Sequence, residues 1–189
     1  MVADGSEEIE FSASLDVMAR GGLRVTVASA MSDKRCTLSR GLKVEADVLV
    51  KDVKMGHTFD VIVLPGGMPG ATHLAENADL VQMLKDQKAQ GRWYAAICAS
   101  PAVVLKGKGI ATDETMVCYA YKDFTDAIAK KGMVPSDRVA VSGKCITSVS
   151  PSSAIDFGLA IVECVVGKEK ADHVAKDLMM VDRHRPVFH

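Results

Sequence analysis

The stretch 60–64 has the sequence DVIVL, and it runs directly into the glycine-rich stretch 65–70, PGGMPG. A short apolar run rich in β-branched residues, followed at once by turn residues, is typical of a buried strand. The arrangement recurs at 93–97, where WYAAI predicts a strand that enters a tight turn at 98–101, CASP. Two buried strands that each lead into a turn and a helical segment indicate a parallel α/β sheet.

The rest of the chain alternates in the same way. A helix is predicted from its cap candidate Ser6 to about Arg20, with acidic residues in its first turns. The final pair of helices is preceded by a predicted hairpin at 138–149. We therefore expect a doubly wound α/β sheet in a single domain, residues 1–189. Further strands are predicted at 23–30, 42–44 and 116–119, and further helices up to 90 and at 101–105, 122–131, 151–166 and 168–181.

The start of the chain departs from this pattern. In a doubly wound sheet the strand before the first helix usually lies near the middle, yet only residues 1–3 precede the turn at Asp4. The first strand is therefore predicted to be cut short. Either the sequence lacks a few N-terminal residues, or the sheet has a real defect that weakens the fold.

Composition excludes several classes of protein. Of the 189 residues 48% are hydrophobic and 25% charged, and the formal net charge is −1, which argues against disorder and against nucleic-acid binding. The sequence shows no apolar run of the length of a membrane span and no signal peptide at its start, so we expect a cytoplasmic protein. The five cysteines lack a Cys-x-x-Cys pair, which predicts reduced thiols with no disulfide framework and no zinc site.

Cys98 is the strongest candidate for chemistry. It lies between a predicted buried strand and a helix N-terminus, where the local field favours thiolate and where open α/β sheets bind ligands. The Gly66-Gly67 loop should reach the same sheet edge, so the N–H groups of Gly67 and Ala99 could form a pocket for an anion. The alternative is a small buried core thiol beside an ordinary turn.

Glu10 lies on an apolar-leaning face of the first predicted helix. Partial desolvation there would keep its carboxyl group protonated, able to donate a hydrogen bond to a thiolate or to move a proton. The alternative is a solvated first-turn glutamate like its neighbours. None of the histidines is placed by the sequence pattern to serve Cys98, which disfavours a Cys-His-acid hydrolase.

Taken together, three segments resemble the DJ-1/ThiJ/PfpI superfamily and its DJ-1 branch. They are DGSEEIE at 4–10, VLPGG at 63–67 and AAICASP at 95–101. The match continues through FGLAIVE at 157–163 and GKE at 167–169, so it covers nearly the whole chain. This resemblance implies a flavodoxin-like sandwich, similar to class I glutamine amidotransferases, that is usually a homodimer and needs no cofactor or metal.

The resemblance also assigns roles. Cys98 matches the family's reactive cysteine, Glu10 the protonated carboxyl group bonded to it, and Gly67 and Ala99 the backbone donors. Gly66 adjoins the site, and Arg20 and Arg40 match arginines found near the site and the dimer interface. Members are described as glyoxalase III enzymes, as deglycases of methylglyoxal adducts, and as redox sensors or chaperones whose cysteine oxidises readily.

Three departures from the family pattern bear on activity. Ala99 replaces the histidine of the protease-like PfpI branch, so we expect no peptidase activity. Tyr119 replaces the histidine that many DJ-1 relatives place near the cysteine, and Val149 replaces an arginine of a later site loop. Two functions follow from the sequence: a cofactor-free enzyme acting on methylglyoxal or glyoxal and their adducts, or a non-enzymatic redox sensor or oxidative-stress chaperone using the same cysteine.

Overall fold

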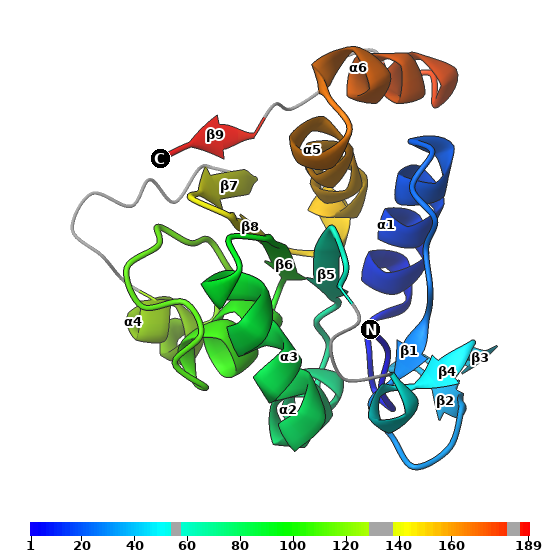
Figure 1. Ribbon diagram of the computed structural model, residues 1–189, viewed down its shortest axis with the longest axis vertical. Helices are drawn as coiled ribbons and strands as arrows, with labels where there is room; N and C mark the ends of the chain where they lie inside the picture. The colour runs from blue at the N-terminus through cyan, green and yellow to red at the C-terminus, as the bar shows by residue number, and fades with distance from the viewer. Residues whose placement is uncertain (54–57, 129–137, 181–185) are drawn as a thin grey trace.

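A computed structural model describes residues 1–53, 58–128, 138–180 and 186–189. Helices cover both faces of a central sheet, as Figure 1 shows. The predicted α/β sandwich with a mostly parallel sheet is confirmed, because every pairing in the main sheet is parallel except β7 with β8. Its strands, in spatial order, are β5 (Val61–Leu64), β6 (Trp93–Ile97), β8 (Cys145–Ser148), β7 (Val139–Ser142) and β9 (Val187–Phe188).

Residues 1–3 lie between the main sheet and a smaller one. The smaller sheet pairs β1 (Ala28–Ser29) with β4 (Val48–Leu49) in parallel, while β2 (Arg35–Thr37) and β3 (Lys43–Glu45) form an antiparallel ribbon. Val2 forms a parallel bridge with Ser29, and the Met1 amino group donates to the Val63 carbonyl at 2.8 Å. The shortened first strand therefore has the central position that the sequence predicted for it.

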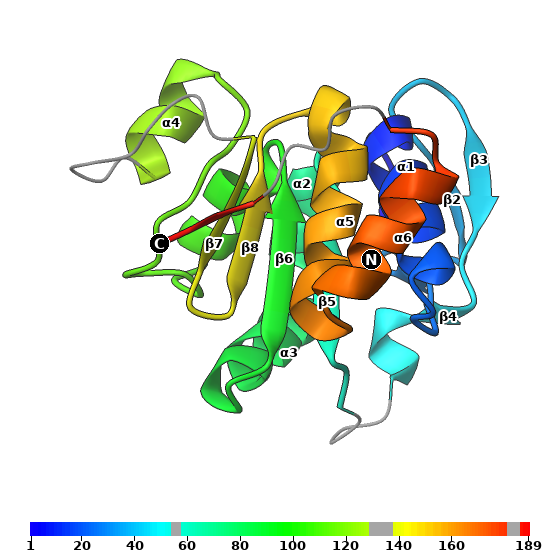
Figure 2. The ribbon, with the colours of Figure 1, turned by 90° about the horizontal axis from the view of Figure 1, so that it is seen from above.

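The helices form two layers, which Figure 2 shows from above. One layer covers the face of the sheet on which α5 lies; it contains α1 (Glu8–Arg20), α5 (Ala154–Val165) and α6 (Lys168–Asp177). The other contains α2 (Gly70–Glu76), α3 (Ala78–Ala89), the π-helical turn η2 (Pro101–Lys106) and α4 (Lys122–Ile128). Short 3₁₀ turns occur at η1 (Val50–Asp52) and η3 (Pro151–Ser153).

Helix α5 is covered on two sides within one protomer. Phe157 and Ile161 pack in the cluster beneath the sheet, whereas Leu159 and Val162 pack with residues of α1 and α6. A Cβ at Gly158 would lie 2.8 Å from Val17 Cβ, so glycine lets α1 and α5 approach closely. Most apolar residues of α5 are thus buried inside the protomer, although Ile155 is exposed, and homodimer formation stays a prediction.

Two predicted strands are not formed as expected. Of the stretch 23–30 only β1 is a strand, because residues 23–27 have no strand beside them on the side that faces β5. The stretch 116–119 is irregular, since the Val117 N–H donates to the Thr147 side chain and not to a neighbouring backbone. Helix α4 is described as far as Ile128, so 129–131 of its predicted range lie outside the described residues. Helix α6 ends at Asp177, so the prediction was wrong for 178–180, which form a turn, and 181 lies outside the described residues.

Candidate active site

Cys98 occupies a strained turn at the end of β6. Its φ is +65°, in the left-handed region that costs a side-chain-bearing residue about 1–2 kcal/mol. Its N–H donates to the Ser148 carbonyl at 2.9 Å, which continues the pairing of β6 with β8 into the turn. The residue is buried, with 9% of its surface exposed. A cysteine held this way matches the geometry of a nucleophile elbow.

Glu10 reaches the same place from the first turns of α1. The helix is capped by Glu7, whose carboxylate accepts from the Glu10 N–H at 2.8 Å, and not by Ser6 as the sequence suggested. The Glu10 side chain is fully buried. Its Oε2 accepts from the Gly66 N–H at 2.8 Å, while its Oε1 has no hydrogen-bond partner among the described residues. The carboxyl group also interacts with the Cys98 thiol.

The two side chains perturb each other's proton affinity. Burial raises the pKa of Glu10 to about 7, against the opposing effects of the Cys98 thiol and the Gly66 N–H. Burial, followed by the negative charge of Glu10, raises the pKa of Cys98 to about 12, although the N–H groups of Gly67 and Ala99 act to lower it. Desolvation therefore outweighs the thiolate-favouring field that the sequence suggested at Cys98. The pair therefore loses its first proton near pH 7, and the negative charge that forms lies mainly on the carboxylate, because the thiol has the higher pKa.

Glycine is required at both positions of the loop after β5. A Cβ on Gly66 would lie 2.6 Å from Cys98 Cβ and 2.8 Å from Glu10 Oε2. Gly67 has a φ of +83°, and its Cβ would lie 2.5 Å from the Gly5 carbonyl oxygen. The loop thus fits between the turn of Cys98 and the start of α1, with its backbone N–H groups directed at the acidic pair.

Ser100 fixes this loop to the turn of Cys98. Its buried hydroxyl group donates to the Pro65 carbonyl at 2.5 Å. We did not single out Ser100 from the sequence, although it belongs to the stretch CASP. A serine two positions after Cys98 is too common a pattern to predict this hydrogen bond without knowledge of the fold.

Of the other predicted neighbours of the site, Tyr119 contacts Cys98, whereas Arg20 and Arg40 have partners elsewhere. Tyr119 adjoins the turn through its backbone, because its N–H donates to the Cys98 carbonyl at 2.8 Å, and its side chain is 47% exposed. Arg20 pairs with Asp16 at 2.8 Å on the outer side of α1. The Arg40 N–H donates to the Glu8 carboxylate in the turn between β2 and β3. Neither arginine bonds to Cys98 or Glu10 in the part of the chain that the structure describes.

Two of the described histidines have partners outside the pair. His73 Nδ1 bonds to the Asp4 carbonyl at 2.9 Å, and His173 Nε2 lies 3.3 Å from the Asp177 carboxylate. His57 and His184 lie outside the described residues. Among the residues described there is also no cluster of three side chains suited to a metal ion, and no helix long and apolar enough to cross a membrane.

Comparison with known proteins accounts for this geometry. Residues 1–164 match the model of the DJ-1/PfpI family. The chain belongs to that family. Among solved structures, Toxoplasma gondii DJ-1 in its oxidized form is 44% identical with a TM-score of 0.89, and the alignment covers 96% of each chain. The crystal structure of Drosophila melanogaster DJ-1beta is 34% identical with a TM-score of 0.88, over 95% of each chain.

Curated relatives of the family differ in length. The glutathione-independent glyoxalase DJR-1.2 of Caenorhabditis elegans is 38% identical, over 94% of this chain and 92% of its own. The Arabidopsis thaliana DJ-1 homolog B is 37% identical over 95% of this chain, but the match spans 40% of the plant protein. The chain therefore spans less than half the length of that relative, whereas it matches DJR-1.2 along almost all of it.

Proposed function

We propose that this protein converts small α-oxoaldehydes such as methylglyoxal to 2-hydroxy acids, with Cys98 as nucleophile and no cofactor. The observation that carries the proposal is the buried pair of Cys98 and Glu10, with the backbone donors of Gly67 and Ala99 on the sulfur side. A carboxyl group whose pKa is about 7 can both give and take a proton at neutral pH. That is the property an aldehyde isomerisation requires.

The first step forms a bond between sulfur and carbon. The Glu10 carboxylate takes the proton of the Cys98 thiol as the sulfur attacks the aldehyde carbon, and the carbonyl electron pair moves to oxygen. The N–H groups of Gly67 and Ala99 stabilise the alkoxide that develops. Glu10 then gives its proton to this oxygen, which leaves a hemithioacetal and a Glu10 carboxylate.

The following steps move hydrogen between adjacent carbons. The Glu10 carboxylate removes the proton from the former aldehyde carbon, which gives an enediolate. The hydroxyl proton passes from the first oxygen to the neighbouring one, and Glu10 returns its proton to the neighbouring carbon. The product is the thioester of a 2-hydroxy acid: one carbon has been oxidised and the other reduced, so no external oxidant is needed. Water then attacks the thioester, releasing the acid and the Cys98 thiol. On hemithioacetal or aminocarbinol adducts, the Cys98 sulfur would displace the substrate's thiol or amine, which would leave with a proton from Glu10. The resulting hemithioacetal on Cys98 would then follow the same steps, which would constitute deglycase activity.

The family supports this proposal, since a relative of matching length is named a glutathione-independent glyoxalase. Tyr119 stands where many family members have histidine. Because the proposed steps use Glu10 for every proton transfer on carbon, they do not depend on a histidine. Tyr119 contacts the turn of Cys98 through its backbone, and we expect slower turnover than in relatives whose histidine assists proton transfer.

Methylglyoxal consumption by purified variants tests the proposal. We expect Cys98→Ser to lose about three orders of magnitude in kcat/KM, because it removes the nucleophile. Cys164→Ser is the matched control, since Cys164 is half-buried near the C-terminal end of α5 and the charges that act on its thiol are those of Glu163 and Lys144. Unchanged turnover in Cys98→Ser, or an equal loss in both variants, would refute the role of Cys98.

We also propose that Cys98 senses peroxide. The unpartnered Oε1 of Glu10 is the specific observation in favour, because a protonated carboxyl oxygen there can donate to an oxygen added to sulfur. The Toxoplasma gondii relative was solved in an oxidized form. Peptide mass spectrometry after graded peroxide should show Cys98 oxidised before the other four thiols. Oxidation of all five at one rate would contradict the sensor role.

Homodimer formation is a further part of the proposal. Ile9, Leu42 and Met68 are each about half exposed, at 53%, 49% and 51%. They gather near the site, because the Leu42 N–H approaches the Glu8 carboxylate and Met68 follows Gly67. Burying such side chains favours association. Sedimentation should give a dimer for the native protein and a weakened one for Ile9→Asp; a monomer in both would contradict it.

A further inference from the structure

The pairing of β5 with β6 ends just before the candidate site. Leu64 is the last residue of β5 that pairs with β6, opposite Ala96. Pro65 follows it and has no N–H, so it cannot donate a further hydrogen bond to β6. The Cys98 N–H lies on the other side of β6, where it donates to the Ser148 carbonyl. The loop after β5 is therefore held against the turn of Cys98 by contacts other than strand pairing.

Ser100 makes such a contact with its side chain. The hydroxyl group is buried and donates to the Pro65 carbonyl at 2.5 Å. Ser100 immediately precedes η2, its backbone is helical with a φ of −65°, and Pro101 is the first residue of that turn. Because proline restricts the backbone at the start of a helical turn, the hydroxyl group is attached to a well-defined position.

The Pro65 carbonyl belongs to the same peptide unit as the Gly66 N–H. This unit is trans, and the C=O and N–H of a planar trans peptide point in opposite directions. The Gly66 N–H donates to Glu10 Oε2 at 2.8 Å. One rigid unit is thus held at its oxygen by Ser100 and directs its N–H at Glu10. A hydrogen bond accepted by the carbonyl also polarises the unit, which strengthens the bond that its N–H donates.

The Gly66 N–H stabilises the ionised form of Glu10. Burial raises the pKa of Glu10 to about 7, while the Cys98 thiol and the Gly66 N–H act in the opposite direction. The titratable groups that act on Glu10 are Cys98, from the turn after β6, and Glu7, on α1 itself, whose negative charge raises the pKa further. Cys98 is the reacting group in the proposed mechanism. The Gly66 N–H is therefore the donor that stays on the carboxylate while the thiol reacts.

We propose that Ser100 is a positioning residue for the reaction proposed above: by holding the Pro65–Gly66 peptide, its hydroxyl group keeps the Gly66 N–H on Glu10 and makes the carboxylate available as a base. Without the hydroxyl group, the Gly66 N–H stabilises the carboxylate less, so Glu10 keeps its proton to a higher pH. The inference rests on the proposed function for its effect on turnover. Its effect on Glu10 is measurable without substrate.

Ser100→Ala removes the hydroxyl group, and a ¹³C NMR titration of the Glu10 carboxyl carbon measures the result directly. We expect the midpoint to rise by about half a pH unit or more. The pH profile of methylglyoxal turnover should move with it, so kcat/KM should fall about threefold at about pH 6 and recover at about pH 9. A general loss of rigidity would lower turnover at every pH. Ser100→Thr keeps the hydroxyl group and should keep the native midpoint.

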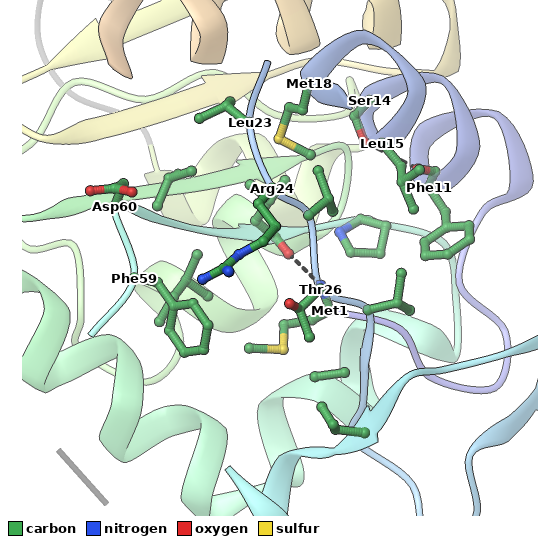
Figure 3. Close-up of a pocket in the computed structure, with 18 of the residues that line it drawn as sticks. Met1, Phe11, Ser14, Leu15, Met18, Leu23, Arg24, Thr26, Phe59 and Asp60 are labelled. Atoms are coloured by element: carbon green, nitrogen blue, oxygen red, sulfur yellow. Dashed lines mark hydrogen bonds between the residues drawn. The ribbon is translucent and has the colours of Figure 1, made fainter. Parts of the chain in front are cut away.

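Ser14→Ala is the matched control. Ser14 is also buried, and its hydroxyl group donates to the Glu10 backbone carbonyl at 2.5 Å. It lies one turn further along α1, beside a cavity of about 320 Å³ between residues 23–27 and β5, as Figure 3 shows. The substitution removes a buried hydroxyl group from a carbonyl of Glu10 itself, but leaves the peptide that donates to its carboxylate intact. The midpoint should therefore stay native.

A second variant keeps the test decisive if Ser100→Ala does not fold. Ser100→Gly removes the same hydroxyl group and should show the same rise. A native midpoint in the variants that lack the hydroxyl group would overturn the proposal, and so would an equal rise in Ser14→Ala. If the native protein does not turn over methylglyoxal, the proposed function fails, and the NMR midpoints still decide the role of Ser100.

Discussion

The two edges of β5 differ sharply. On one edge all four residues of β5 pair with β6, which in turn pairs with β8. On the other edge the Met1 amine makes a bond to Val63, and the cavity follows. The paired edge supports a residue at positive φ, Cys98, whereas the open edge leaves residues 23–27 irregular despite their β-branched sequence. The strained backbone of Cys98 is stabilised because β6, which ends there, is paired with β5 on one side and β8 on the other.

The candidate site depends on both edges. Cys98 arrives from β6, on the paired side. Glu10 and Gly5 arrive from the segment that follows residues 1–3, and they meet Cys98 at the loop formed by Gly66 and Gly67. The position of Glu10 relative to Cys98 therefore depends on how residues 1–3 hold the start of α1. Variants on each side should separate the two contributions.

The largest effect on activity is expected at Glu10, which comes from α1 and contacts both Gly66 and Cys98. Glu10→Gln keeps the shape and the Gly66 contact but cannot move a proton, so kcat/KM should fall by two to three orders of magnitude. The native rate should rise through about pH 7, as the coupled pair loses its first proton. The variant should lack that rise, and the pKa of its Cys98 should be lower because the carboxylate charge is gone. A pH profile of methylglyoxal turnover checks this, and an unshifted rise in the variant would show that another group titrates.

A smaller effect compares the two faces of β5. Leu64 is fully buried against α2 and α3, so Leu64→Ala should lower the free energy of unfolding by about 3 kcal/mol. Val63 lines the cavity and is only half-buried, so Val63→Ala should cost about 1 kcal/mol or less. Urea unfolding of both variants measures the difference. Equal losses would mean that the side of β5 facing the cavity is packed as tightly as the other.

A side chain added in the loop after β5 should lower the free energy of unfolding by a similar or smaller amount. Gly66→Ala places a Cβ against Cys98 and Glu10, and should lower stability by about 1–3 kcal/mol together with a large loss of turnover. Gly91→Ala is the control, because its φ is +67° but nothing lies within 4 Å of an added Cβ. It should lose about 1 kcal/mol and keep full turnover. Comparable turnover in both variants would argue against close packing at Gly66.

The smallest effect is a pH dependence of stability, to which the Glu10 carboxyl group and the Met1 amine contribute with opposite signs. Raising the pKa of Glu10 from 4.5 to about 7 makes the folded state hold the extra proton, so stability falls as pH rises from 4.5 to 7. Lowering the pKa of the Met1 amine from 8.0 to about 5 has the opposite sign, so stability rises from pH 5 to 8. N-terminal acetylation removes the second contribution. Between pH 5 and 7 the acetylated protein should therefore lose stability more steeply, by up to about 1 kcal/mol per pH unit. Parallel curves would contradict burial of the Met1 amine.

The same contrast explains what could be predicted from the sequence. Strand β6 and the hairpin of β7 and β8 were predicted to within a residue at each end, because local β-branched runs and their turns agree with partners that are present. Residues 23–27 carry the same local signal, but a strand also needs a paired backbone beside it, and the sequence pattern alone could not show that none of the described strands pairs with them. The central position of residues 1–3 could be predicted, because it follows from the topology.

Within the site, the residue types could be predicted but not their environment. The turn at Cys98 was visible as a strand followed by CASP, and the loop at Gly66 as a glycine pair after a strand. Burial of Glu10 depends on a contact with Gly66, far along the chain, so the helix pattern alone favoured a solvated carboxylate and only the family resemblance pointed to the site. Ser100 and the raised pKa of Cys98 likewise depend on tertiary contacts.

The most direct test of the account is to follow enzyme activity and Cys98 oxidation in one sample. Graded peroxide should add about 32 Da, two oxygens, to the peptide that contains Cys98. If Cys98 is both the nucleophile and the sensor, methylglyoxal turnover should fall in proportion to the oxidised fraction while the peptide containing Cys164 stays unchanged. Full turnover in protein whose Cys98 is completely oxidised would contradict the central claim.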